Sequence, residues 1–239
     1  MTETKPLLMA EEVIAWYGKR QVLNGITVSV PASQIVAIVG HNGAGKSTLL
    51  KTVFGLLPTW TGSLRLDGKL IRRPSPRMML EAGVAYAPQG NRVFSSLTVK
   101  ENLEFAAVAL KKRTTSTEAI TRVIGMFPML SALLQKRAST LSGGEKQVLA
   151  LASSLMWSPR LLLLDEPSLG LSPTLAADVF QHLSQLNRDH GTTVLIVEQR
   201  VHQVLKIAHH VYVLRNGEVS FSGPTSALSD EDHLRQVYL

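Results

Sequence analysis

The sequence contains no cysteine and no long apolar segment. The absence of cysteine among 239 residues excludes disulfide bonds and thiolate metal sites, and it is typical of a cytosolic protein. No apolar run approaches the ~18 residues that suggest a membrane-spanning helix. The first residues, MTETKPLL, lack the charged and apolar regions of a signal peptide. We therefore expect any attachment to a membrane to come through other chains.

Acidic residues are the minority among the charged ones. The chain has 25 Lys and Arg against 18 Asp and Glu, a net charge of +7, which is compatible with binding to nucleic acid or anionic lipid. The basic residues form short clusters beside polar loops, such as Arg72 with Arg73 and Lys111 to Arg113. We interpret them as a solvated face and partly as the lining of an anion-binding cleft. Contact with lipid headgroups is the alternative, and no nucleic-acid partner is expected.

A phosphate-binding loop is predicted between a strand and a helix. Ile35 to Val39 reads IVAIV, which favours a buried parallel strand, and Lys46 to Phe54 favours a helix. The glycines between them let the backbone aim N–H groups at phosphates, helped by the positive end of the helix. Lys46 would meet the β and γ phosphates, and Ser47 would bind Mg²⁺. The predicted nucleotide-binding residues are Gly40, His41, Asn42, Gly43, Ala44, Gly45, Lys46, Ser47 and Thr48.

Two acidic residues follow a second predicted strand. Leu161 to Leu164 is an apolar run that ends in Asp165 and Glu166. Carboxylates at the end of a buried strand lie at the crevice where an open parallel sheet binds ligands. We predict Asp165 as a Mg²⁺ ligand and Glu166 as the general base that activates the attacking water.

A second anion site is predicted at LSGGE, Leu141 to Glu145. The paired Gly143 and Gly144 precede a predicted helix from Glu145 to Met156, so Ser142 and free N–H groups lie at a helix N-terminus. One γ phosphate seldom needs two such sites from one chain.

These motifs together resemble the ATP-binding-cassette (ABC) family. GHNGAGKST resembles its Walker A motif, LSGGE its signature, LLLLDEP its Walker B motif, and Ser168 to Leu171 its D-loop. In that family two cassettes pair head to tail, so the signature of one closes over ATP held by the P-loop of the other. The resemblance covers nearly the whole chain. It implies an ATPase that uses ATP and Mg²⁺, with Ser142, Gly143 and Gly144 acting on the partner's nucleotide.

The implied fold is a P-loop α/β cassette in a single ABC ATPase domain, residues 1–239. It combines a mostly parallel core sheet, an N-terminal antiparallel β portion and a small inserted helical lobe. The nucleotide-binding core would comprise residues 1–88 and 160–239, and the helical lobe residues 89–159. Val99 to Lys112 and Thr117 to Phe127 read as helices. Asn216 and Gly217 predict a hairpin turn, and the stretch from Thr225 predicts short helices.

Further family positions can be assigned by their order along the chain. Tyr17 resembles the aromatic residue that stacks on adenine; its neighbour Trp16 is the alternative, because alternation along a strand would place only one of the two rings outside. Gln89 resembles the Q-loop glutamine, which reaches the metal and the attacking water. His209 and His210 show no metal spacing and are predicted to end a helix, where positive charge suits the dipole.

Two positions depart from the family pattern. Gln199 stands where the family commonly has a histidine that contacts the γ phosphate; an amide can donate a hydrogen bond but carries no charge. We assign Gln199 a catalytic part on this basis. Ser153 stands where an arginine is common, and nothing in the sequence explains the change.

The departure at Gln199 narrows the resemblance. Glu198 with Gln199, Pro167 to Pro173, Asn91 to Leu103 and the ending HLRQVYL are similar to one ATPase subunit of the branched-chain amino acid importers. That likeness implies two permease subunits, a second ABC ATPase, different or identical, and an extracytoplasmic substrate-binding protein. It places the chain at the cytoplasmic face of the membrane, held peripherally by the permeases.

Three alternatives remain open from the sequence. Urea or short-amide importers carry similar ATPases. Soluble cassettes act in repair, translation or cofactor assembly, but they usually carry a long coiled coil or two cassettes per chain. A nucleotide-binding regulator without turnover would tend to lose Glu166.

Overall fold

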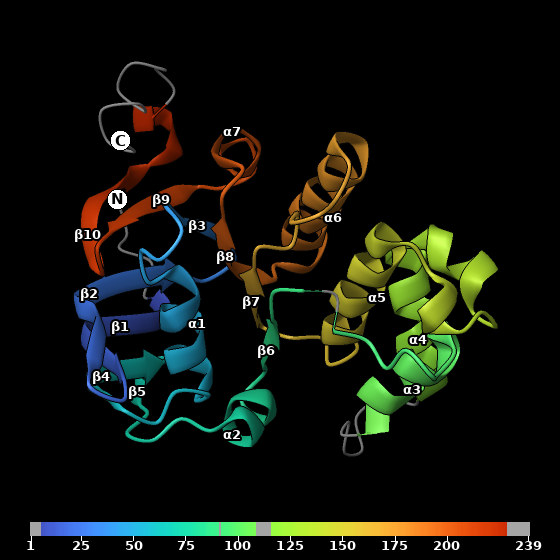
Figure 1. Ribbon diagram of the computed structural model, residues 1–239, viewed down its shortest axis with the longest axis horizontal. Coiled ribbons are helices and arrows are strands. Elements are labelled where there is room, and N and C mark those ends of the chain that lie inside the picture. Colours follow the sequence, from blue (N-terminus) through green and yellow to red (C-terminus); the bar gives the residue numbers. More distant parts are fainter. Residues whose placement is uncertain (1–5, 91, 109–115, 229–239) are drawn as a thin grey trace.

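The computed structural model describes residues 6–90, 92–108 and 116–228, in two sheets with helices around them (Figure 1). The four-stranded sheet is antiparallel, in the order β2 (Arg20–Pro31), β1 (Pro6–Tyr17), β4 (Trp60–Leu66), β5 (Lys69–Leu70). The six-stranded sheet runs β10 (Glu218–Pro224), β9 (His210–Arg215), β3 (Ile35–Gly40), β8 (Thr193–Glu198), β7 (Leu161–Asp165), β6 (Val84–Ala87). Within it only β10 is antiparallel. The expected combination of a mostly parallel core sheet and an N-terminal antiparallel portion is confirmed.

The central strands β3, β7 and β8 of the six-stranded sheet are buried at every position, which explains their nearly continuous aliphatic sequences. Alternate residues of β3 point to opposite faces: Val36 and Ile38 pack with α1 (Lys46–Phe54) and the antiparallel sheet, whereas Ala37 and Val39 pack with the helices of the other side. The antiparallel sheet and the longer helices thus form separate layers on the two sides of one parallel sheet.

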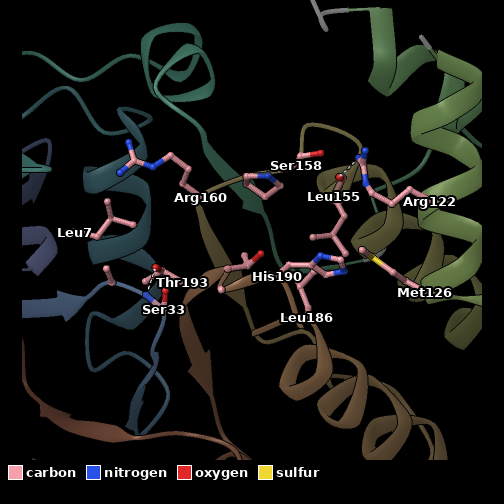
Figure 2. Close-up of a pocket in the computed structure, with 14 residues that line it drawn as sticks. Leu7, Ser33, Arg122, Met126, Leu155, Ser158, Arg160, Leu186, His190 and Thr193 are labelled. Carbon is pink, nitrogen blue, oxygen red and sulfur yellow. Dashed lines mark hydrogen bonds between the residues drawn. The ribbon is translucent and has the colours of Figure 1, made fainter. Parts of the chain in front are cut away.

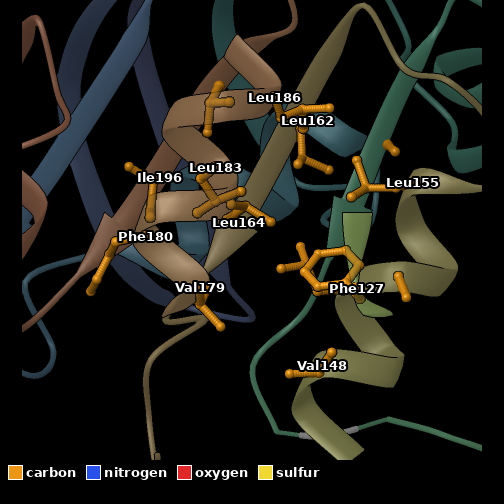
Figure 3. Packing of buried hydrophobic residues seen from close by; sticks show 14 of the residues in the cluster. Phe127, Val148, Leu155, Leu162, Leu164, Val179, Phe180, Leu183, Leu186 and Ile196 are labelled. Carbon is orange, nitrogen blue, oxygen red and sulfur yellow. The ribbon is translucent and has the colours of Figure 1, made fainter. Parts of the chain in front are cut away.

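The helices between β6 and β7 gather at one end of the molecule, away from the antiparallel sheet (Figure 1). These are α3 (Val99–Val108), α4 (Ser116–Met126), α5 (Gly143–Leu155) and the 3₁₀ turns η1 (Pro128–Leu133) and η2 (Ala138–Thr140). Figure 3 shows how their apolar side chains, including Phe127 and Val148, continue the cluster formed by α6 (Pro173–His190) and the sheet. The smaller elements are α2 (Pro76–Glu81), α7 (Val201–Leu205) and η3 (Thr225–Leu228).

Two local predictions were wrong. The signature helix α5 begins at Gly143, two residues before its predicted start, because Ser142 and Glu145 form a capping box that brings both glycines into the first turn. His209 and His210 do not end a helix: His210 begins β9, and the His209 ring accepts a hydrogen bond from Ile35 N at 3.1 Å.

The remaining local predictions have mixed outcomes. The hairpin is confirmed, with Asn216 and Gly217 in the left-handed region that a tight turn between β9 and β10 requires. Helix α3 follows the predicted stretch from Val99, but residues 109–115 lie outside the described residues, as do Asn91 and the chain beyond Leu228. Across the ranges described, no helix is long and apolar enough to cross a membrane.

Candidate functional site

The loop between β3 and α1 has a shape that only glycine permits at two positions. Gly40 has φ 152°, and a Cβ there would lie 2.2 Å from Leu214 O. Gly45, the N-cap of α1, has φ 102°, and a Cβ there would lie 2.6 Å from Leu23 Cδ2. The loop is therefore wrapped tightly against β9 and β2, and it leads directly into the N-terminus of α1, where free N–H groups favour an anion.

Lys46 places a buried ammonium group inside this loop. Its Nζ donates to Gly40 O at 2.8 Å and to His41 O at 3.0 Å, and the residue is 4% exposed. Glu166 Oε1 lies 3.9 Å from the same nitrogen. Burial lowers the pKa of Lys46, and the nearby carboxylates, led by Glu166, oppose that shift. The loop thus holds the Lys46 ammonium group close to the Glu166 carboxylate.

Asp165 and Ser47 join the two predicted motifs. Ser47 Oγ donates to Asp165 Oδ1 at 2.7 Å, and Tyr86 OH donates to Asp165 Oδ2 at 3.0 Å. Burial and the Asp165 charge raise the pKa of Tyr86, which keeps its hydroxyl protonated as a donor. A hydroxyl and a carboxylate suit Mg²⁺, which takes one or two carboxylates together with substrate phosphates. Within the part of the chain that the structure describes, no group of three or more His, Cys, Asp or Glu is placed to hold a metal.

Glu166 is bracketed by two amides. Gln89 Nε2 donates to its Oε2 at 2.8 Å, and Gln199 Nε2 donates to its Oε1 at 2.6 Å. The residue is 5% exposed, and its backbone has φ 51°, a left-handed conformation in which its N–H still reaches Val197 O at 2.9 Å. Glu166, predicted from its place after a buried strand, thus meets Gln89 and Gln199, which the family resemblance assigned.

The signature segment lies apart from this group. Ser142 Oγ accepts from Glu145 N at 3.2 Å, and Glu145 Oε2 accepts from Ser142 N at 2.7 Å. Ser142 and Gly143 are exposed. Helix α5 packs on the face of the parallel sheet opposite to α1, so this chain does not bring its signature to its own P-loop.

Three further positions lie as follows. Tyr17 is 46% exposed at the end of β1, whereas Trp16 is half-buried. Ser153, at the arginine position, donates from Oγ to Leu149 O at 2.8 Å within α5, and the structure gives no further reason for the change. Tyr86 was not predicted as a site residue, and alternation along β6 was the only signal available for it.

A cavity of about 340 Å³ lies elsewhere in the molecule (Figure 2). Its lining includes Ser33, Arg160 and Thr193, which precede or begin β3, β7 and β8. The P-loop and Asp165 stand at the opposite, carboxyl ends of these strands, where parallel sheets bind ligands. The cavity is therefore separate from the candidate active site.

Comparison with known proteins adds to this geometry. Residues 23–169, more than half of the chain, match the ABC transporter family. This chain belongs to the ABC transporter family. One relative is "High-affinity branched-chain amino acid transport ATP-binding protein BraG" of Pseudomonas aeruginosa, which is 42% identical to this chain. The alignment covers 98% of this chain and 99% of the relative. A second relative is "Probable branched-chain amino acid transport ATP-binding protein LivF" of Archaeoglobus fulgidus, which is 37% identical to this chain. The alignment covers 97% of this chain and 98% of the relative.

The fold of the ABC chain also matches solved structures. The ADP conformation of an ATP-binding cassette from an ABC transporter superposes with a TM-score of 0.84 at 28% identity, over 96% of this chain and 97% of that one. The chain is therefore an ATPase of the ABC family, with buried polar contacts arranged around Glu166.

Proposed function

We propose that this chain is the ATP-binding and ATP-hydrolysing subunit of an importer for branched-chain or other hydrophobic amino acids. The observation that carries the proposal is the Glu166 carboxylate, fixed between Gln89 and Gln199 and 3.9 Å from Lys46. A carboxylate so oriented, after the end of β7 and beside the P-loop lysine, suits the activation of water.

The P-loop residues Gly40 to Thr48 bind the phosphates of ATP in this proposal. Lys46 exchanges its contacts with Gly40 O and His41 O for the β and γ phosphates. Ser47 and Asp165, with Gln89 as a third oxygen donor, hold Mg²⁺, which when bound neutralises charge on the β and γ phosphates. Tyr17 stacks on adenine, for which its exposed ring is available.

Glu166 is the general base. Each of its carboxylate oxygens accepts one amide hydrogen bond and keeps a second lone pair, so the attacking water can donate to Glu166 while both amides stay in place. The Gln199 amide has a second N–H, which can donate to the γ phosphate. The neutral amide supplies a hydrogen bond there and no proton.

The signature of this chain acts on a second ABC ATPase, different or identical. Ser142, Gly143 and Gly144 are at the N-terminus of α5, with Ser142 and Gly143 exposed to a partner. Permease subunits hold the pair at the cytoplasmic face of the membrane, and an extracytoplasmic binding protein delivers the substrate. No nucleic-acid partner enters this proposal.

The names of the relatives support the proposed substrate. BraG and LivF are named for branched-chain amino acid transport, and each aligns along almost all of this chain. The test is ATP hydrolysis by the assembled transporter in vesicles containing its binding protein. We expect leucine, isoleucine or valine to stimulate hydrolysis and Lys46→Ala to abolish the stimulation. Stimulation by urea or short amides alone would contradict the assigned substrate.

A further inference from the structure

The segment Ser168–Leu171 begins two residues after Glu166. It is held at one end by Glu198, the last residue of β8, and at the other by Arg200 from the following loop. Ser168 N donates to Glu198 Oε1 at 2.9 Å, and Arg200 Nη2 donates to Leu171 O at 2.8 Å. Ser168 is 1% exposed and Leu171 5%, whereas Leu169 between them is 46% exposed. The segment is therefore a loop anchored at both ends, with Leu169 as its exposed apolar tip.

Glu198 joins two backbone segments through one buried carboxylate. Its Oε1 accepts from Ser168 N, and its Oε2 accepts from Gln199 N at 3.0 Å and Arg200 N at 3.4 Å. The side chain is at the end of a central strand and is 1% exposed. Burial raises its pKa, and the N–H groups of Ser168, Gln199 and Arg200 oppose that shift. A buried carboxylate is retained only where hydrogen bonds compensate it, and here these three bonds come from the two loops that it joins.

Gln199 lies between the two anchoring residues in sequence. Its side chain contacts Glu166 at 2.6 Å, while Leu169 N donates to Glu166 O at 3.1 Å. The Ser168–Leu171 segment is therefore linked through Glu198 to the Gln199 backbone N–H, and through Leu169 N to Glu166, by direct hydrogen bonds.

We infer that Glu198 and Arg200 are positioning residues: they fix Ser168–Leu171 against the strand end that carries Gln199, and so couple the exposed Leu169 tip to the geometry of Glu166. The coupling to catalysis rests on the proposed function. The anchoring itself does not, and the two can be tested separately.

The anchoring is tested by amide hydrogen exchange of the isolated full-length chain. Glu198→Gln replaces one acceptor oxygen by an NH₂ group, and we expect Ser168 N–H to exchange about ten-fold faster, the lower range for a lost bond to a charged group. Arg200→Ala should speed exchange across residues 168–171, and Arg200→Lys should restore part of the protection. Arg77→Ala, which removes an exposed ion pair with Glu81, is the matched control and should change nothing there. Unchanged exchange in both Glu198→Gln and Arg200→Ala would overturn the inference; if Glu198→Gln does not fold, Arg200→Ala decides.

The coupling is tested by steady-state ATP hydrolysis of the assembled complex. We expect Arg200→Ala to lower kcat by about ten-fold or more, because Gln199 and Glu166 lose their fixed geometry, and to leave KM for ATP within about two-fold. Arg200→Lys should recover most of kcat. If Arg200 had only a structural role, Arg200→Ala would lower the melting temperature and leave kcat unchanged. That outcome would overturn the coupling. If the wild-type complex hydrolyses no ATP, the proposed function fails, while hydrogen exchange still decides the anchoring.

Discussion

Helices α1 and α5 both begin with a glycine-containing turn suited to an anion, but their surroundings differ. At α1 the first residue, Lys46, is 4% exposed and its ammonium already contacts two loop carbonyls and a carboxylate. At α5 the N-cap Ser142 is exposed, and its only described side-chain partner is the Glu145 backbone of its own capping box. One turn is enclosed by its own chain, and the other faces outward.

The difference indicates how one nucleotide site can be divided between chains. The α1 turn carries the buried Lys46 ammonium, and Asp165 and Glu166 face this turn from the end of β7. Under the proposed function, this turn binds nucleotide with groups of its own chain. The α5 turn offers N–H groups and a hydroxyl, with the acidic Glu145 in its first turn. Such a turn adds little affinity by itself and acts best on a phosphate that another surface has already bound.

The largest effect is expected at the enclosed turn. Glu166→Gln removes the base and should lower turnover by about 10² to 10⁴ fold while ATP binding persists, because the introduced amide has nearly the same shape as the carboxylate and can still form hydrogen bonds. Hydrolysis of the assembled complex and calorimetry of ATP binding measure the two quantities. Glu218→Gln, at the start of β10, is the control. An unchanged rate for Glu166→Gln would remove Glu166 from the role of base.

The next effect concerns Gln199. If its amide donates to the γ phosphate, Gln199→Ala should cost about 1.5 to 3 kcal/mol, or roughly one to two decades in hydrolysis rate. Gln203→Ala, in α7, serves as a matched control, because its Oε1 has no hydrogen-bond partner among the described residues. Equal transport rates with Gln, Ala and His at position 199 would show that this side chain has no direct catalytic part.

A smaller effect distinguishes the role of Ser142 as the N-cap of α5 from its proposed role at the partner's nucleotide. As an N-cap, Ser142→Ala should lower the free energy of unfolding by about 1 kcal/mol, and Ser142→Gly by only a few tenths. Ser172→Ala, the N-cap of α6, should destabilise by a similar amount. Thermal unfolding measures stability, and hydrolysis of the complex measures function. If Ser172→Ala lowered hydrolysis as much as Ser142→Ala, capping alone would explain Ser142.

The smallest effect is a dependence on pH at the same cap. The Ser142 backbone N–H lowers the pKa of Glu145 in the folded chain, so its contribution to stability is present above the unfolded pKa and is lost as pH falls through the folded pKa. Glu145→Gln should flatten this part of the stability profile in acid. The same profile in wild type and Glu145→Gln would contradict the assignment.

The parts of the site that depend on local order could be predicted from the sequence. The predicted helix Lys46–Phe54 and the predicted start of a strand at Thr193 are both confirmed. Apolar runs and glycines indicate strands and turns from the local sequence alone. The earlier start of α5 was available in the S-x-x-E spacing of Ser142 and Glu145.

Other features required the fold itself. Tyr86 meets Asp165 across 79 positions, and Ser168 meets Glu198 across 30, so no local pattern reports either contact. His209 was misassigned because its ring accepts the Ile35 backbone N–H from a strand that is 174 positions away. Which side chains meet at the strand ends depends on the order of the strands in the sheet. That order cannot be predicted from any single segment of the sequence.

The comparison of α1 with α5 is tested most directly by Ser142→Arg, which places bulk and charge at the exposed turn. The account predicts that the isolated variant chain binds ATP with the wild-type affinity by calorimetry, while hydrolysis by the assembled complex falls at least about ten-fold through lost closure on the partner's γ phosphate. Reduced ATP affinity of the isolated chain would mean that the signature serves its own P-loop. Undiminished hydrolysis by the complex would mean that it serves none, and either result would contradict the division of one site between two chains.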